Sequence, residues 1–291
     1  SILMGQHTES GDGVLLQSPV FFEFKLAIRN NGRRDVKNPL KLIDGRYQID
    51  FEDLEVKASD PDTTMLILCN PHNPVGRVWT EAELKRVAEI CERHGVFVIA
   101  DEIHGDFALS PHTYTPYLRV AEPITHACAA CISPAKTFNI SGMVDAVTVI
   151  PDEVDRHQFH EFIERYQIHK INVFTSVATE VAYREGAAWL DALLAYIQGN
   201  VDWVSAYLEA NVPPVSLVEP EGTFLLWLDF RQLDLDVKEL TRFLAVDACI
   251  ALSPGYWVGR EGAGFARMTI GCPRATVRRA FDNLARAIAA R

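Results

Sequence analysis

The chain has 291 residues, of which 48% are hydrophobic and 23% are charged, and its formal net charge is −11. This length predicts about two domains with a sizeable core, and the acidic balance disfavours a protein that binds nucleic acid or an anionic membrane surface. No apolar run reaches the roughly 18 residues that a membrane span requires.

The first elements that the pattern predicts form a strand, helix, strand unit. Residues 65–69 and 96–100 are short continuous apolar runs, which are typical of buried parallel strands. Residues 80–94 begin with a capping-box pattern, end before a glycine, and carry one apolar face made by Leu84, Val87, Ala88 and Cys91. Such a crossover unit predicts a parallel sheet.

Polar residues stand at the ends of three predicted strands. Asn73 follows the first, Asp101 follows the second, and Lys136 follows a weaker third strand at residues 126–132. Open α/β sheets bind their ligands outside the carboxyl ends of their strands. We therefore expect these three side chains to converge on one crevice.

The second half has a different organisation. Helices are expected at residues 151–169, 173–184, 185–211, 236–245 and 273–290, and strands at residues 215–218, 224–228 and 265–270. Such a run of strands and helices is typical of an α+β unit. We expect a large α/β domain over residues 1–190 and a smaller α+β domain over residues 191–291, with the boundary inside the long helix.

Several other kinds of site lack their motifs. A metal site built from His72, His104, Asp106 and His112 is disfavoured, because no His-Glu-x-x-His pattern is present. The nucleophile motif of serine hydrolases and the Walker phosphate motif are also missing from the sequence. The six cysteines follow no regular spacing, and Cys128 and Cys131 would point to alternate faces of one strand. We expect reduced core thiols, as in a cytoplasmic protein.

Seven motifs carry a family resemblance over essentially the whole chain. They are Gly11-Asp-Gly-Val14, Gln17-Ser-Pro-Val-Phe21, Asn70 to Gly76, Asp101-Glu-Ile-His104, Ser133 to Gly142, Glu221 to Asp229, and Phe265 to Arg274. In these motifs the chain resembles the fold-type I pyridoxal-phosphate enzymes of the aminotransferase class I and II superfamily. It is most similar to their MalY/PatB branch of cystathionine β-lyases and cysteine-sulfur lyases. That branch carries histidine three residues after the aspartate, whereas general aminotransferases usually carry tyrosine there.

The resemblance implies pyridoxal 5′-phosphate as cofactor. The positions that match cofactor contacts of the family are Phe21, Asn73, Asp101, His104, Ser133 and Lys136. Lys136 would hold the aldehyde covalently, and the Asp101 carboxylate would keep the ring nitrogen protonated. Asn73 and His104 would donate to the ring oxygen, and Phe21 would stack on the ring. Ser133 would contact the phosphate.

The resemblance also implies a substrate anchor. Arg267 matches the residue that binds the α-carboxylate of a small amino acid, for which the guanidinium fork is suited. Arg274, at the start of the last helix, matches a different position, and we expect it to be structural and paired with an acid. The family's chains extend further at the amino end, so the sequence is expected to lack a phosphate-cradling helix start.

The resemblance implies carbon–sulfur β-elimination, with release of a thiol, pyruvate and ammonia, by a cytoplasmic homodimer. An aminotransferase is the alternative, because it shares every step up to removal of the α-proton. A non-catalytic or regulatory protein on the same fold is an alternative from another class.

Overall fold

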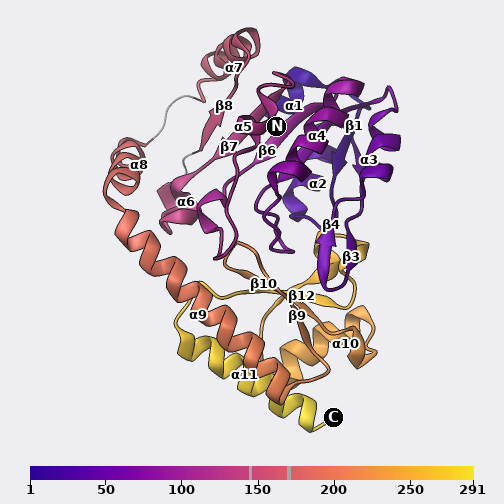
Figure 1. Ribbon diagram of the computed structural model, residues 1–291, viewed down its shortest axis with the longest axis vertical. Coiled ribbons are helices and arrows are strands. Elements are labelled where there is room, and N and C mark those ends of the chain that lie inside the picture. Colours follow the sequence, from indigo (N-terminus) through magenta and orange to yellow (C-terminus); the bar gives the residue numbers. More distant parts are fainter. Residues whose placement is uncertain (144–145, 169–171) are drawn as a thin grey trace.

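The computed structural model describes residues 1–143, 146–168 and 172–291, and these form two main sheets with helices around them (Figure 1). The larger sheet lies in the first half of the chain. Its strands, in spatial order, are β2 (Arg34–Lys37), β1 (Gly13–Leu16), β5 (Thr63–Cys69), β6 (Phe97–Asp101), β7 (Cys128–Ile132) and β8 (Val147–Val149). Neighbouring strands are parallel except for β7 and β8.

Helices cover both faces of this sheet. They are α1 (Ile2–His7), α2 (Phe22–Asn30), α3 (Phe51–Ala58), α4 (Glu81–His94), α5 (Tyr117–Ala121) and α7 (Glu153–Arg165). The short helix α6 (Pro134–Thr137) follows β7, and α8 (Val173–Glu185) leads from the first half into the second. Side chains alternate along β5, so that Leu66 and Leu68 pack with α3, α4 and α5, while Met65 and Ile67 pack with α1 and α2. Burial on both faces explains why the strands are continuously apolar.

The second sheet is antiparallel and lies in the second half. Its order is β11 (Ser253–Pro254), β12 (Phe265–Thr269), β10 (Leu225–Asp229) and β9 (Ser216–Val218). The helices α9 (Ala187–Asn211), α10 (Val237–Arg242) and α11 (Arg274–Ala289) accompany it, and a π-helical turn at Phe243–Asp247 continues α10. Short 3-10 turns lie at Gly105–Phe107, Ser141–Met143, Arg231–Leu233, Gly255–Val258 and Arg260–Gly262. None of the described helices is both long and apolar enough to cross a membrane.

The two halves share part of one core. Trp227 of β10 and Phe265 of β12 stack with their ring centroids 5.1 Å apart, and both belong to the core that contains α3, α4 and α5. The Trp227 indole also donates to the Tyr47 hydroxyl at 3.2 Å. Tyr47 lies on β4 (Arg46–Gln48), which forms a hairpin with β3 (Lys41–Ile43). The hairpin therefore joins the halves.

The α/β class is confirmed, and the predicted strands at residues 65–69, 96–100 and 126–132 are β5, β6 and β7. The predicted helices at 173–184 and 185–211 are α8 and α9, which meet at Gly186. There a side chain would clash with the Ala182 carbonyl oxygen and the Phe138 ring. The helix expected over residues 151–169 ends at Arg165, and residue 169 lies outside the described residues. The domain boundary near residue 190 falls inside α9 and stays a prediction.

Candidate functional site

The structure brings three of the predicted residues to one edge of the large sheet. Asn73 lies in the turn after β5, Asp101 is the last residue of β6, and Lys136 lies on α6 directly after β7. The strand register pairs Cys69 with Asp101 and Asp101 with Cys131, so the three strands end level with one another. Parallel neighbours therefore present these residues at the same edge. Asp101 itself lies within its strand rather than beyond it.

The Asp101 carboxylate has few partners in the structure. It accepts one hydrogen bond from the Ile103 backbone N–H at 3.3 Å. Burial raises the pKa of Asp101 to about 6, while that hydrogen bond and the positive charge of Lys136 act in the opposite direction.

The His104 imidazole is buried. The residue is only 3% exposed, and its ring packs against the Phe224 ring at a centroid distance of 5.4 Å. Burial, and then the charges of Lys136 and Arg267, lower the pKa of His104 to about 4. Its Nδ1 atom is buried without a hydrogen-bond partner in the described part of the chain. A buried polar atom of this kind calls for a partner.

Arg267 connects the second sheet to this crevice. It lies on β12, and its guanidinium donates to the Asn73 side-chain oxygen at 2.9 Å and to the Ser253 hydroxyl at 3.4 Å. Neither partner is an acid, and within residues 1–143, 146–168 and 172–291 no carboxylate pairs with Arg267. Burial lowers its pKa. A partly buried cation with only neutral partners is suited to an anionic ligand.

Two further predicted residues lie beside these groups. The Phe21 backbone N–H donates to the Asn73 carbonyl oxygen at 3.1 Å, which places Phe21 next to the turn after β5. Ser133 is the N-cap of α6, and its hydroxyl accepts from the Ala135 N–H at 3.1 Å. This bond fixes the start of the short helix that carries Lys136. The roles of Phe21 and Ser133 toward a cofactor stay predictions.

Arg274 differs from the expectation in its partners. Its guanidinium donates to the Asn200 side-chain oxygen at 2.8 Å and lies over the Tyr196 ring, both on α9. A Cβ atom on Gly199 would lie only 2.5 Å from that guanidinium, so the glycine permits the close approach. The prediction of an acidic partner for Arg274 is therefore wrong. Within the described ranges its guanidinium contacts an amide and an aromatic ring of α9 instead.

Sequence reasoning missed two residues that support the site. The Ser253 hydroxyl accepts from Arg267 although β11 and β12 are separated along the chain. His72 is fully buried, and its Nε2 lies 2.9 Å from the Pro19 carbonyl oxygen, which ties the turn after β5 to the segment before Phe21. The sequence gives only local signals for these two residues. Ser253 begins a Ser-Pro-Gly turn, and His72 lies inside an Asn-Pro-x-Asn-Pro turn.

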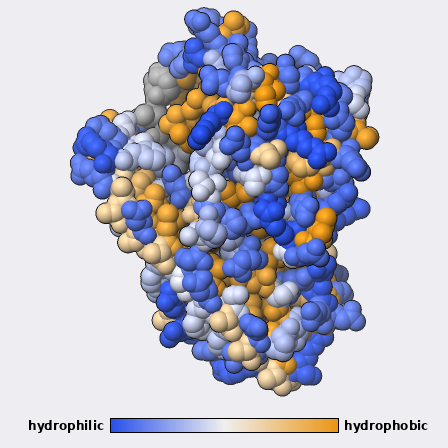
Figure 2. All heavy atoms as spheres, in the orientation of Figure 1, coloured by the Kyte–Doolittle hydropathy of each residue, from blue (hydrophilic) through white to orange (hydrophobic). Residues whose placement is uncertain are grey.

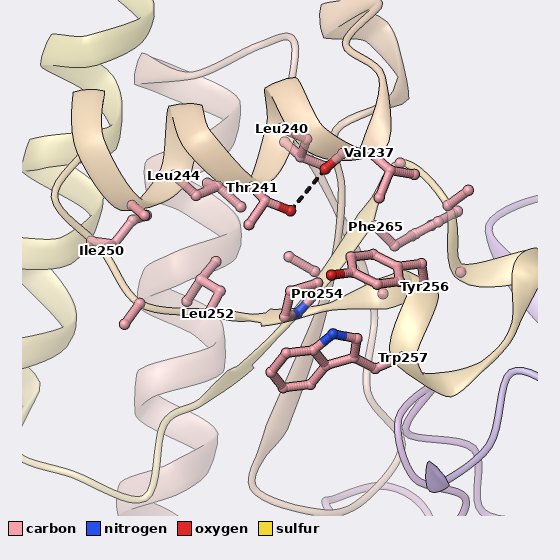
Figure 3. A pocket seen from close by; sticks show the side chains of 17 residues that line it. Val237, Leu240, Thr241, Leu244, Ile250, Leu252, Pro254, Tyr256, Trp257 and Phe265 are labelled. Atoms are coloured by element: carbon pink, nitrogen blue, oxygen red, sulfur yellow. Dashed lines mark hydrogen bonds between the residues drawn. The ribbon is translucent and has the colours of Figure 1, made fainter. Parts of the chain in front are cut away.

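One apolar cavity lies in the second half of the chain. It has a volume of about 230 Å³ and lies between α10, the π-helical turn and β11. Figure 3 shows Leu240 and Leu244 facing Leu252 across the cavity, with Tyr256 and Trp257 on another side. None of the described residues that line it is charged. In the described ranges no group of three or more His, Cys, Asp or Glu residues could hold a metal ion.

Comparisons with known proteins give consistent matches. The family described as aminotransferase class I and II matches residues 1–284. The chain is 40% identical over 290 residues to cystathionine beta-lyase PatB of Bacillus subtilis, and 35% identical over 292 residues to protein MalY of Escherichia coli. Each match covers 100% of this chain and 74% of the relative. The crystal structure of cystalysin from Treponema denticola, which contains a pyridoxal 5′-phosphate cofactor, superposes with a TM-score of 0.96 at 32% identity. That superposition covers 99% of this chain and 73% of cystalysin.

Proposed function

Because the chain belongs to the aminotransferase class I and II family, we propose that it is a pyridoxal 5′-phosphate-dependent carbon–sulfur lyase. Its substrates are cystathionine or related cysteine conjugates, which it cleaves by β-elimination to a thiol, pyruvate and ammonia. The relatives with the matches reported above include a cystathionine beta-lyase and a structure that contains this cofactor.

The described residues fit this cofactor. His104 has an unpartnered buried ring nitrogen, and Asp101 has a single backbone hydrogen bond, so both have capacity for a polar ligand. We assign the cofactor aldehyde to Lys136, the ring nitrogen to Asp101, and the ring oxygen to Asn73 and His104. Phe21 would stack on the ring. Ser133, the N-cap residue of α6, would contact the phosphate. When bound, the cofactor withdraws electrons from the substrate α-carbon.

The contact between Arg267 and Asn73 is the observation that carries the proposal. It places a cation without an acidic partner beside the residues assigned to the cofactor. Arg267 binds the α-carboxylate of the amino acid and so orients its α-carbon. The Lys136 amine would take the α-proton as a general base. Asp101 would keep the ring nitrogen of the cofactor protonated.

An aminotransferase uses the same residues up to proton removal, so the products decide between the two activities. The protein is incubated with pyridoxal 5′-phosphate and cystathionine, and pyruvate and free thiol are measured, with Lys136→Ala as the inactive control. We expect pyruvate and thiol in equal amounts from the wild type only. Amino transfer to an added 2-oxo acid without pyruvate would identify an aminotransferase. A protein that neither binds the cofactor nor turns over would be a non-catalytic member of the family.

We also propose that the protein works as a homodimer. β8, α7 and α8 leave apolar side chains exposed, and α8 has Thr175 as its one buried residue in the described part. Val173 is 76% exposed and Phe174 is 72% exposed. Figure 2 shows apolar residues gathered beside β8 on one face. An exposed surface of this kind is typical of an interface.

Sedimentation measurements test the homodimer. We expect Phe174→Asp to shift the protein toward the monomer, because it places a charge in the apolar surface. Val56→Asp serves as the control, since Val56 is 70% exposed on α3, outside this surface. A monomeric wild type, or equal effects of both changes, would contradict the assignment.

A further inference from the structure

One hydrogen bond joins two of the segments that carry the site. The Thr137 hydroxyl donates to a carboxylate oxygen of Asp106 at 2.7 Å. Thr137 ends α6 and directly follows Lys136. Asp106 lies in the 3-10 turn Gly105–Phe107, two residues after His104. The bond therefore links the helix that carries the residue assigned to the cofactor aldehyde with the turn that follows a residue assigned to the ring oxygen.

The turn that carries Asp106 is held by the rest of the fold. Phe107 is only 1% exposed, and its carbonyl oxygen accepts from the Thr223 backbone N–H at 2.8 Å. A Cβ atom on Gly105 would lie 3.0 Å from the Tyr114 ring, so this ring packs directly on the turn. The Asp106 residue is exposed, but its backbone has a fixed place.

The helix α6 depends more on outside contacts. It has only four residues, and a helix of this length is marginal on its own. Side-chain hydrogen bonds hold both of its ends, because Ser133 accepts from the Ala135 N–H and Thr137 donates to Asp106. Thr137 is 0% exposed. Loss of the carboxylate would leave a buried hydroxyl without this partner, at a cost in free energy that a shift of α6 would relieve. Lys136 lies between the two held ends.

We infer that Asp106 is a positioning residue of the site, which acts through Thr137 to fix the place of Lys136 relative to His104. The inference rests on the proposed function. The aldehyde and the ring hydroxyl of pyridoxal 5′-phosphate are on neighbouring ring carbons, so the lysine and the histidine must meet adjacent parts of one ring. Groups in such a site tolerate little displacement, and a shift of about 1 Å can lower a rate about 10²-fold. Asp106 itself is not assigned a contact with the cofactor or the substrate.

Thr64 provides a matched control for Thr137. Its hydroxyl donates to the Asp12 carboxylate at 2.9 Å, so it makes the same kind of hydrogen bond. Thr64 lies near the amino end of β5, whereas the site lies at the carboxyl end of this strand. Thr64→Val and Thr137→Val therefore remove the same chemical group, but only Thr137→Val removes it beside Lys136.

The first experiment does not depend on turnover. Each protein is loaded with pyridoxal 5′-phosphate, and the visible circular dichroism of the bound cofactor is divided by its absorbance, which reports how asymmetrically the cofactor is held. We expect Thr137→Val and Asp106→Ala to lower this ratio to the same value. The double variant should lower it no further, because all three proteins lack one and the same hydrogen bond.

Two variants should keep the wild-type ratio. They are Thr137→Ser, which retains the hydroxyl, and Thr64→Val, which loses a hydroxyl away from the site. The inference would be overturned by losses that add in the double variant, by an unchanged ratio in Thr137→Val, or by an equal loss in Thr137→Ser.

The second experiment separates kcat from KM, with cystathionine as substrate. We expect Thr137→Val and Asp106→Ala to lower kcat roughly 10- to 100-fold with KM unchanged, because the substrate anchor Arg267 is not altered. A purely structural bond would instead lower the stability of Thr137→Val and Thr64→Val alike and leave kcat at the wild-type value, and this result would overturn the inference while the lyase function stands.

The wild type decides on the proposed function separately. If it binds the cofactor but releases no pyruvate, the lyase function fails, and the circular dichroism of the variants still decides on Asp106. A wild type that binds no cofactor would overturn both.

Discussion

At the scale of single residues, Asp101 shows how a functional group can lower stability. Its pKa in the folded chain is about 6, above the value of about 3.9 in an unfolded chain. The folded state therefore binds the proton more tightly. As the pH rises from about 4 to about 6, the folded state must ionise a buried carboxyl, and stability falls. Above about pH 6 the Asp101 carboxyl is ionised in the folded state, and the full free-energy cost of ionising it there reduces the stability.

Asp101→Asn tests the effect of this carboxyl group on stability and its assigned role in catalysis. Without cofactor, we expect the variant to be more stable than the wild type at pH 8, by about 1 to 3 kcal/mol, with the difference vanishing below about pH 4. With cofactor, its turnover should fall roughly 10² to 10⁴-fold, because the ring nitrogen loses its carboxylate. Urea unfolding at the two pH values and the pyruvate assay measure these effects. Unchanged stability together with normal turnover would refute the assignment of Asp101.

Arg267 should matter for the substrate and not for the cofactor. We expect Arg267→Ala to weaken amino-acid binding by about 2 to 5 kcal/mol, because the α-carboxylate loses a charged partner in a partly buried position. The amount of bound cofactor should stay at the wild-type level. Titration with an unreactive amino acid, followed by the visible absorbance of the bound cofactor, measures the first quantity. A variant that loses cofactor and amino acid equally would mean that Arg267 supports the whole crevice.

At the scale of elements, Arg274 fastens α11 to α9. Its hydrogen bond to Asn200 and its contact with the Tyr196 ring join the two helices, and Asn200 also donates to the Ile270 carbonyl oxygen at the end of β12. We expect Arg274→Ala to lower the free energy of unfolding by about 1 to 3 kcal/mol, with amino-acid affinity retained. Arg279→Ala is the control in the same urea experiment, because Arg279 is an exposed residue of α11. If Arg274→Ala lost more amino-acid affinity than Arg267→Ala, Arg274 would be the carboxylate anchor and Arg267 the structural residue.

The elements found from the sequence are those with local signals. α4 has its capping box between Thr80 and Glu83 and its left-handed Gly95, and β5 is buried on both faces, so the pattern alone identifies both. β2 is different. It is a short strand at the sheet edge with charged residues, and it exists because it pairs with β1. No local pattern predicts such a strand.

The features of the site also divide into those that the sequence predicts and those that depend on tertiary packing. Asn73, Asp101 and Lys136 were found because parallel strands end at one edge, a rule that needs only the order of the elements. The hydrogen bonds of Arg267 to Asn73 and Ser253 join residues from different sheets, and sequence spacing contains nothing about them. The partners of Arg274 were mispredicted for that reason, since they depend on how α9 and α11 pack.

At the scale of the whole molecule, a buried ion network joins the two halves. Glu221 pairs with Arg46 at 2.6 Å and with Arg77 at 2.9 Å, and Arg77 also pairs with Glu83 at 2.9 Å. Arg77 is only 2% exposed. Burial alone would raise the pKa of Glu221, but the arginines outweigh this effect and hold it below its usual value.

Glu221→Gln tests the network. Because the folded pKa is lowered, the carboxylate stabilises the protein above its unfolded pKa of about 4.3, and this contribution is lost as the pH falls further. We expect a loss of about 3 to 5 kcal/mol at pH 7, since the change leaves Arg77 buried without one of its acids. The difference from the wild type should shrink below about pH 4. Thermal unfolding at both pH values measures it, and a constant difference would contradict the ionic explanation.

The order of the site residues along the chain has a consequence during synthesis. Every residue assigned to the cofactor precedes residue 137, whereas Arg267 follows Lys136 by 131 residues. A ribosome that adds about 5 to 20 residues per second needs roughly 7 to 26 seconds for that interval. Trp227 and Phe265, which complete the core of the first half, also emerge within it. A nascent chain thus presents its reactive lysine before it can select an amino acid, so cofactor capture must either wait for the carboxyl-terminal half or begin without substrate selection.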